Sequence, residues 1–258
     1  MAHACGLSSS LLLAAVAAFV GLLIGTVGVG GVLMVSFLAL VGGASGALTI
    51  HQAAATSLFS FLFTGIVGTW LYQRRGSIDW RITLPVCVAA LVFGFCGAAV
   101  AALVDPRPLA IAIAFVIVAA GVYVLFPLKA RPQPRDGKGK RERWLLASVG
   151  AGSGFGSGFS GAGGPLFSVP LMVILHYVPL TAVATSQVLQ IVAATSGSIA
   201  NLRHGFIDWN TAAVITVFEL LGLVVGVRLA HVASALALRR LAGALCVLTG
   251  AILLFRSF

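Results

Sequence analysis

Arg-Arg-Gly-Ser-Ile-Asp-Trp occupies residues 74–80 of this chain, and Arg-His-Gly-Phe-Ile-Asp-Trp occupies residues 203–209. Ala-Thr-Ser at 55–57 recurs in the same way as Ala-Thr-Ser at 184–186, with the same offset of about 129 residues. Hydrophobic bias alone does not produce this ordered series, because Arg, Asp and Trp are rare in the chain. The sequence therefore predicts an internal duplication.

The composition around these motifs is that of a membrane protein. Of the 258 residues, 60% are hydrophobic and only 9% are charged, and the mean hydropathy is +1.10. A soluble domain carries about 25% charged residues, and a helix crosses a bilayer with about 20 apolar residues. Apolar stretches of that order cover residues 8–41, 48–72, 82–104, 108–128, 144–176, 180–202, 210–232 and 237–255.

These stretches predict an all-α integral membrane protein with about eight transmembrane segments. We expect a first four-segment repeat over 1–128, a basic linker over 129–143 and a second repeat over 144–258. The first and fifth stretches are too long for one span, and each contains a glycine-rich interruption. Breaks at membrane depth are tolerated where they line a cavity or lie buried in protein. Parallel and inverted arrangements of the repeats both stay open.

The basic residues predict an orientation. With eight crossings, the 129–143 run would share one side with Arg74, Arg75, Arg81, Arg203 and Arg256, and both chain termini would lie there too. The positive-inside rule assigns that side to the cytoplasm. This placement also argues against nucleic-acid binding as the reason for the formal charge of +10.

The order of motifs in each half carries a family resemblance. A glycine-rich break, an Ala-x-Ala-Thr-Ser helix and a Gly-x-Ile-Asp-Trp turn follow one another in both halves. The pattern resembles the TauE/SafE family of membrane permeases, also called sulfite exporters, over nearly the whole chain. The resemblance implies an inner-membrane transporter of small sulfur-containing anions, such as sulfite or sulfoacetate, with export as the expected direction. It does not identify the substrate.

The glycine breaks are the first candidate site. A helix that begins inside the membrane presents unpaired N–H groups and about half a positive charge, which favours an anion. Close helix packing is the competing explanation. Pro165 favours the start of a new helix after the second break. The candidate anion-binding residues are Gly28, Gly30, Gly31, Gly161, Gly163 and Gly164.

Polar side chains in apolar segments are the second candidate group. Hydroxyls and amides donate hydrogen bonds to an anion, although they also bond between helices or to their own helix. Gln187 and Gln190 are three residues apart and share one helix face. The full candidate set is Thr56, Ser57, Thr185, Ser186, Gln187 and Gln190.

Three charged residues complete the candidate site. Glu219 lies deep in the 210–232 stretch, where an acid suggests coupling to protons or another ion, or a neutral group held between helices. Arg74 and Arg203 are expected where helices meet the cytoplasm, and topology and headgroup contact are their favoured role, with attraction of anions to the inner mouth as the alternative. Asp79 and Asp208 are expected to cap helices, with the following tryptophans at the membrane interface.

Two other classes of protein remain as alternatives. Ser160 lies in a Gly-x-Ser-Gly string, as in an intramembrane serine protease, with His204 or His231 as its base. A non-transporting assembly subunit is the other. We expect no cofactor and no metal, and no ATP-binding motif is present, so transport would use an ion gradient or the membrane potential. A homodimer stays open.

Overall fold

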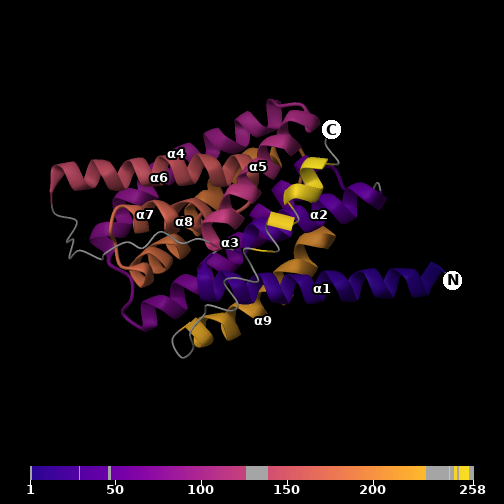
Figure 1. The fold of residues 1–258 in the computed structure, drawn as a ribbon, viewed down its shortest axis with the longest axis horizontal. Helices are drawn as coiled ribbons and strands as arrows, with labels where there is room; N and C mark the ends of the chain where they lie inside the picture. The colour runs from indigo at the N-terminus through magenta and orange to yellow at the C-terminus, as the bar shows by residue number, and fades with distance from the viewer. Residues whose placement is uncertain are drawn as a thin grey trace.

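The computed structural model describes residues 2–28, 30–45, 48–125 and 139–230, together with helical residues 244, 247, 248 and 250–255. In these residues the chain is helical and contains no strand, which confirms the all-α prediction (Figure 1). The helices are α1 (Ala2–Val27), α2 (Gly31–Ser45), α3 (Ile50–Arg74), α4 (Trp80–Leu103), α5 (Pro106–Leu125), α6 (Lys140–Ser160), α7 (Pro165–Ile174), α8 (Pro179–Leu202) and α9 (Trp209–Ala230).

The lengths and compositions of these helices fit a multi-pass membrane protein. Within the described chain, four helices are long and apolar enough to cross a bilayer: α3, α4, residues Pro106–Tyr123 of α5 and residues Trp209–Leu229 of α9. Shorter apolar helices lie at Leu11–Thr26, Gly31–Gly42 and Pro165–Ile174. These short helices belong to the two long stretches in which the sequence predicted breaks.

Both predicted breaks are present, and each ends a helix. Gly28 (φ 77°) and Gly161 (φ 69°) adopt the left-handed conformation that glycine allows after a helix. The chain then folds back on the helix it has left. Gly30 packs against Ile24 of α1, and Phe167 of α7 packs against Gly156 of α6. The first and fifth stretches are therefore helical hairpins rather than single spans.

The repeated turn motif links α3 to α4 and α8 to α9 with the same local chemistry. Gly76 (φ 65°) and Gly205 (φ 67°) make the left-handed turn in each copy. Asp79 accepts a hydrogen bond from the Arg81 N–H at 2.9 Å, and Asp208 accepts one from the Asn210 N–H at 3.2 Å. The two aspartates are therefore helix caps, as predicted.

The two helices that carry the Ala-Thr-Ser motif cross at the centre of the bundle. Glycine contacts give their relative direction, since Gly68 of α3 packs on Gln187 of α8, Gly65 on Ile191, and Leu58 on Gly197. In these contacting pairs, the residue number in α3 decreases as the residue number in α8 increases. The helices α3 and α8 are therefore antiparallel.

One end of the bundle, here named the linker end, gathers residues 75–81, 139–144 and 177–181. A surface hollow is lined by residues from Arg75 to Arg81 and by Val178, Leu180 and Thr181. The Tyr177 hydroxyl donates to the Glu142 carboxylate at 2.6 Å, which brings the start of α6 to the same end.

The opposite end, here named the far end, gathers residues 49–56 and 203–209. The Asp208 N–H donates to the Thr56 hydroxyl at 3.0 Å, so α9 starts beside the start of α3. Helix α1 runs parallel to α9, because Gly21 packs on Glu219 and Gly25 on Leu223. Helix α1 therefore begins at the far end, and Figure 1 shows it projecting there.

This geometry corrects the predicted distribution of charge. Arg74 ends α3 at the linker end, whereas Arg203 follows α8 at the far end. The start of α1 and the basic start of α6 also lie at opposite ends. The expectation that all of them share one side is wrong, because it counted each broken stretch as one crossing and each stretch instead turns back. Arg256 lies outside the described residues.

The most extensive helix contacts join the two predicted halves. Helix α6 packs on α4 and α1 packs on α9. Small residues allow this close approach, as Gly150 and Gly154 of α6 lie directly on Val86 and Ala90 of α4. Helix α6 begins at Lys140, inside the predicted linker. The division into two repeats stays a prediction, in which each broken segment would pack on a helix of the other half.

Candidate functional site

The two glycine breaks meet inside the bundle. A Cβ added at Gly31 would collide with the carbonyl oxygen of Ala162, and it would lie 2.9 Å from the ring of Phe61. A Cβ added at Gly163 would lie 3.3 Å from the same ring. The breaks are therefore in backbone contact beside the point where α3 crosses α8.

Two helices begin at this meeting point. Helix α2 starts at Gly31, and α7 starts at Pro165, which fits the first turn because proline has no N–H to leave unpaired. Gly164 lies against the backbone of Gln190. A Cβ added at Gly164 would be 3.3 Å from the backbone nitrogen of Gln190. The positive ends of both helix dipoles are thus directed at the centre of the protein.

The two predicted glutamines lie at the same centre and bind the first half of the chain. Gln190 Nε2 donates to the Thr64 hydroxyl at 2.7 Å and to the Phe61 carbonyl at 3.0 Å. Gln187 Nε2 donates to the Ile24 carbonyl at 3.4 Å, and its Oε1 has no hydrogen-bond partner in the described chain. Both side chains are buried, at 0% and 1% exposure.

The four predicted hydroxyl residues, Thr56, Ser57, Thr185 and Ser186, make different kinds of contact. Thr185 shares a 3.1 Å hydrogen bond with Thr83, and Thr56 accepts the Asp208 N–H. Both threonines therefore join helices near the ends of the bundle. The Ser186 hydroxyl donates to Val183 of its own helix at 2.7 Å. Ser57 is buried, and its hydroxyl has no partner among the described residues, so it is the one member of the four with an unused hydroxyl.

Glu219 is fully buried between α9, α1 and α3. Its backbone packs on Gly21, and Ser60 lies beside its carboxyl group. The Ser60 hydroxyl, however, donates to the Ser57 carbonyl at 2.8 Å. Neither carboxylate oxygen has a hydrogen-bond donor in the described part of the chain. Burying an acid at this position is costly, so Glu219 stays a candidate for a functional role.

The two predicted entry arginines do not come together. Arg74 stacks over the ring of Trp70, with 3.7 Å from its Cζ to the ring centroid, at the linker end. Arg203 lies 5.7 Å from the centroid of Phe95 at the far end. The expectation that both arginines lie at one inner mouth is therefore wrong, because α3 and α8 are antiparallel and end at opposite ends of the bundle.

Sequence reasoning missed two polar residues of the centre, Ser60 and Thr64. Together with Ser57 they recur at steps of three and four along α3, which places them on one helix face. That spacing was the available signal. The duplication does not emphasise these two positions, because the second repeat has Leu189 and Ala193 at the matching places.

The protease alternative finds no support in these contacts. The Ser160 hydroxyl donates to the Gly156 carbonyl at 2.6 Å and accepts the Ala162 N–H at 3.3 Å. His204 lies at the far end, where its ring stacks on Phe206 and contacts the Ala200 carbonyl. His231 lies outside the described residues. Ser160 thus stabilises the end of α6.

Apolar helices, two broken segments that meet at mid-bundle and buried polar groups around them are features of polytopic membrane transporters. The family model of the sulfite exporter TauE/SafE matches residues 13–253. The chain therefore belongs to the TauE/SafE family of membrane transporters.

A curated relative agrees with this membership. The chain is 25% identical over 240 residues to the "Probable membrane transporter protein YdhB" of Bacillus subtilis (strain 168), and the match covers 91% of this chain and 96% of the relative. No solved structure matches the chain.

Proposed function

We propose that this protein is a secondary transporter that moves a small anion, a sulfur oxyanion or organosulfonate such as sulfite or sulfoacetate, out of the cytoplasm. The observation that carries the proposal is the meeting of the two glycine breaks, at which α2 and α7 both begin. Two helix N-termini directed at one point stabilise an anion without a lysine or arginine. Membership of the TauE/SafE family supports the substrate class.

The close contact between the breaks suggests how transport proceeds. Gly31 and Ala162 touch, so an anion can lie between the helix N-termini only after the two breaks have moved apart. The antiparallel course of α3 and α8 supports an inverted relation between the halves. In transporters of inverted halves, rocking of one half against the other exposes a central site to each side in turn.

The two glutamines have a defined part in this cycle. In the observed conformation their Nε2 groups donate to Ile24, Phe61 and Thr64 of the first half. When the halves separate, these donors lose their partners and become free to bind the anion. Ser57 and the glycines Gly28, Gly30, Gly31, Gly161, Gly163 and Gly164 complete the proposed site. Thr56, Thr185 and Ser186 would support the helices around it.

Glu219 is the proposed coupling residue. Its carboxyl has no donor among the described residues, and Ser60, on the helix that carries Ser57 and Thr64, lies beside it. Taking up and releasing a proton, or another ion, at this position would link an ion gradient to the movement of α3 against α9.

The linker end is the proposed cytoplasmic face. Arg74, Arg75, Arg81, Arg141 and Arg143 are exposed there, whereas Arg107 and Arg203 are at the far end. The excess of positive charge favours the cytoplasm. Arg74 would then attract anions at the inner mouth and Arg203 at the outer mouth, and the start of α1 would lie outside.

The test is a flux measurement on purified protein in liposomes, with sulfite, sulfate, thiosulfate, taurine, sulfoacetate and matched carboxylates as substrates. We expect saturable flux of a sulfur oxyanion or organosulfonate that is lost in the Gln187→Ala/Gln190→Ala variant. Gln73→Ala, which removes an exposed amide of α3, is the matched control and should keep full flux. If folded protein moves none of these anions, the proposed function is wrong and a non-transporting assembly subunit becomes the better explanation.

A further inference from the structure

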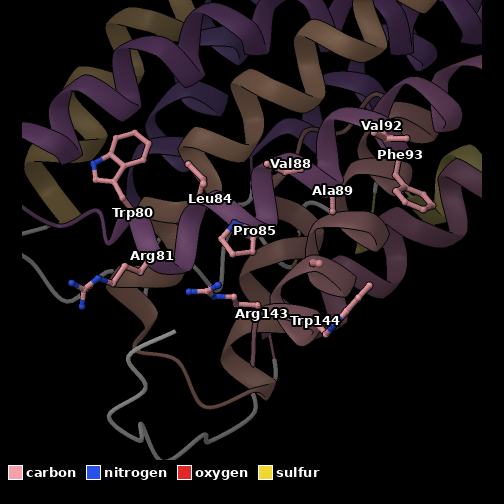
Figure 2. Close-up of a pocket in the computed structure, with 11 residues that line it drawn as sticks. Trp80, Arg81, Leu84, Pro85, Val88, Ala89, Val92, Phe93, Arg143 and Trp144 are labelled. Atoms are coloured by element: carbon pink, nitrogen blue, oxygen red, sulfur yellow. The ribbon is translucent and has the colours of Figure 1, made fainter. Parts of the chain in front are cut away.

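A groove on the membrane-facing surface lies between α4 and α6, away from the central site. It has a volume of about 1070 Å³ and a mostly apolar wall (Figure 2). One face of α4 forms one side of the groove, with Leu84, Pro85, Val88, Ala89, Val92 and Phe93. Helix α6 contributes only the small side chain of Ala147 beyond Trp144, so the flank of α4 stays uncovered.

One end of this groove is polar. Figure 2 shows Arg81 and Arg143 along the same end of the groove, the linker end, with Phe93 and Val92 at the other end. Both arginines are exposed, and neither makes an ion pair within the part of the chain that the structure describes. Among the described residues, the acids closest to these arginines in sequence, Asp79 and Glu142, do not line the groove. Asp79 caps α4, and Glu142 accepts the Tyr177 hydroxyl.

The flanking aromatic residues place this polar end at the membrane interface. Trp80 is 48% exposed and Trp144 is 77% exposed, and both line the groove beside the arginines. Tryptophan prefers the headgroup level of a bilayer, because its ring is apolar and its N–H is polar. The arginines therefore lie at the depth of lipid phosphates.

The length of the apolar wall matches one leaflet. The ten residues from Leu84 to Phe93 rise by about 14 Å along α4, at about 1.5 Å per residue. Half of the hydrocarbon core of a bilayer is about 15 Å thick. An acyl chain that starts at the arginines can thus lie along α4 to the middle of the membrane.

We propose that this groove binds one anionic phospholipid from the leaflet at the linker end. Arg81 and Arg143 hold its phosphate, and the acyl chains lie on the apolar flank of α4. Charge complementarity selects the occupant, since two guanidinium groups that have no ion pair among the described residues favour an anionic headgroup over a zwitterionic one. A bound lipid would cover the contact between α4 and α6, where the predicted halves meet.

The predicted duplication supplies a comparison within the chain. The offset that pairs the two Ile-Asp-Trp motifs pairs Trp80 with Trp209 and Arg81 with Asn210. The corresponding surface of α9 therefore keeps the interfacial tryptophan and lacks the charge. Lipid selectivity belongs to one half of the molecule only.

The experiment is native mass spectrometry of the delipidated full-length protein, titrated with phosphatidylglycerol and with phosphatidylcholine of the same acyl chains. We expect one phosphatidylglycerol to bind in preference to phosphatidylcholine. Arg81→Gln/Arg143→Gln should weaken this binding about thirtyfold, because each arginine near an anionic surface contributes a factor of about five. Lys140→Gln/Arg141→Gln removes two exposed charges of α6 outside the groove and should change binding less than about threefold.

A second measurement locates the lipid. Phosphatidylglycerol brominated on its acyl chains should quench the fluorescence of wild-type protein, and the quenched part should disappear in Trp80→Phe/Trp144→Phe. Equal affinity for the two lipids, equal weakening by the two double variants, or displacement of the lipid by inorganic phosphate alone would each overturn the proposal. So would a dimer that stays intact and takes up no lipid when the lipid is added, because a second copy would then be the occupant.

Discussion

Replacing Gly31 with alanine tests the contact between the two breaks. The added Cβ would collide with the Ala162 carbonyl oxygen and would lie 2.9 Å from the Phe61 ring, whereas ordinary contact begins at 3.4 Å. The ring contact requires a movement of about half an ångström and the closer backbone contact requires more, so the cost lies at or above the upper end of the range of about 1–3 kcal/mol that is typical of overpacking. We therefore expect Gly31→Ala to fold with a melting temperature several degrees lower.

The same substitution should alter anion binding in a defined direction. A methyl group between the breaks destabilises the state in which they touch, and so raises the population of the separated state. Apparent affinity follows that population, so a shift of about 1 kcal/mol strengthens binding about fivefold. Sulfite titrations that follow the thermal shift of purified protein would measure both effects.

Gly152→Ala is the matched control, because it adds the same methyl group to a glycine with nothing within 4 Å of the new atom. It should leave sulfite affinity unchanged and stability unchanged or slightly higher, since alanine favours a helix over glycine. If Gly31→Ala is as stable as Gly152→Ala, the breaks do not touch. If Gly31→Ala is less stable but binds sulfite more weakly, the methyl group costs more in contacts with the anion than it gains in population of the separated state, and the separated-state argument is refuted.

Two further substitutions test other residues of the centre. Glu219→Gln keeps the size of a buried side chain and removes its ability to exchange a proton. The protein should therefore fold normally, while its anion flux loses its dependence on a pH gradient. A gradient-driven flux equal to that of wild type would exclude Glu219 from coupling. Ser160→Ala removes the hydroxyl that bonds Gly156 and the Ala162 N–H, so stability should fall by about 1 kcal/mol while membrane-protein substrates stay uncleaved in both proteins. Cleavage by wild type that Ser160→Ala abolishes would restore the protease alternative.

Features set by local chemistry could be predicted from the sequence. The glycine breaks follow from the conformational freedom of glycine and the proline at the start of α7, and the aspartate caps follow from the turn motif. The all-α fold follows from hydropathy. In each case the interacting residues are close in the chain, so the pattern of residue types carries the information.

The partners of the central polar residues could not be predicted in this way. Gln190 binds Thr64, and Thr185 binds Thr83, across 126 and 102 positions of the chain. The sequence identified these side chains as costly to bury, but the hydrogen bonds that offset the cost depend on how α3, α4 and α8 cross. Thr56 and Thr185 were candidate binding residues for that reason, and their observed contacts join helices instead.

The direction of the chain after each break explains the error in orientation. A glycine in the left-handed conformation allows the chain either to continue across the membrane or to turn back, and hydropathy is the same in both cases. Contacts decide between them: Gly30 returns to Ile24, and Phe167 returns to Gly156. Once both stretches turn back, the helices that follow them, α3 and α8, start from opposite ends, which makes them antiparallel. The reversal of the chain at each break made the predicted orientation of the basic residues wrong. The same reversal brings the starts of α2 and α7 to one point, so the predicted anion site and the error in topology have a single physical cause.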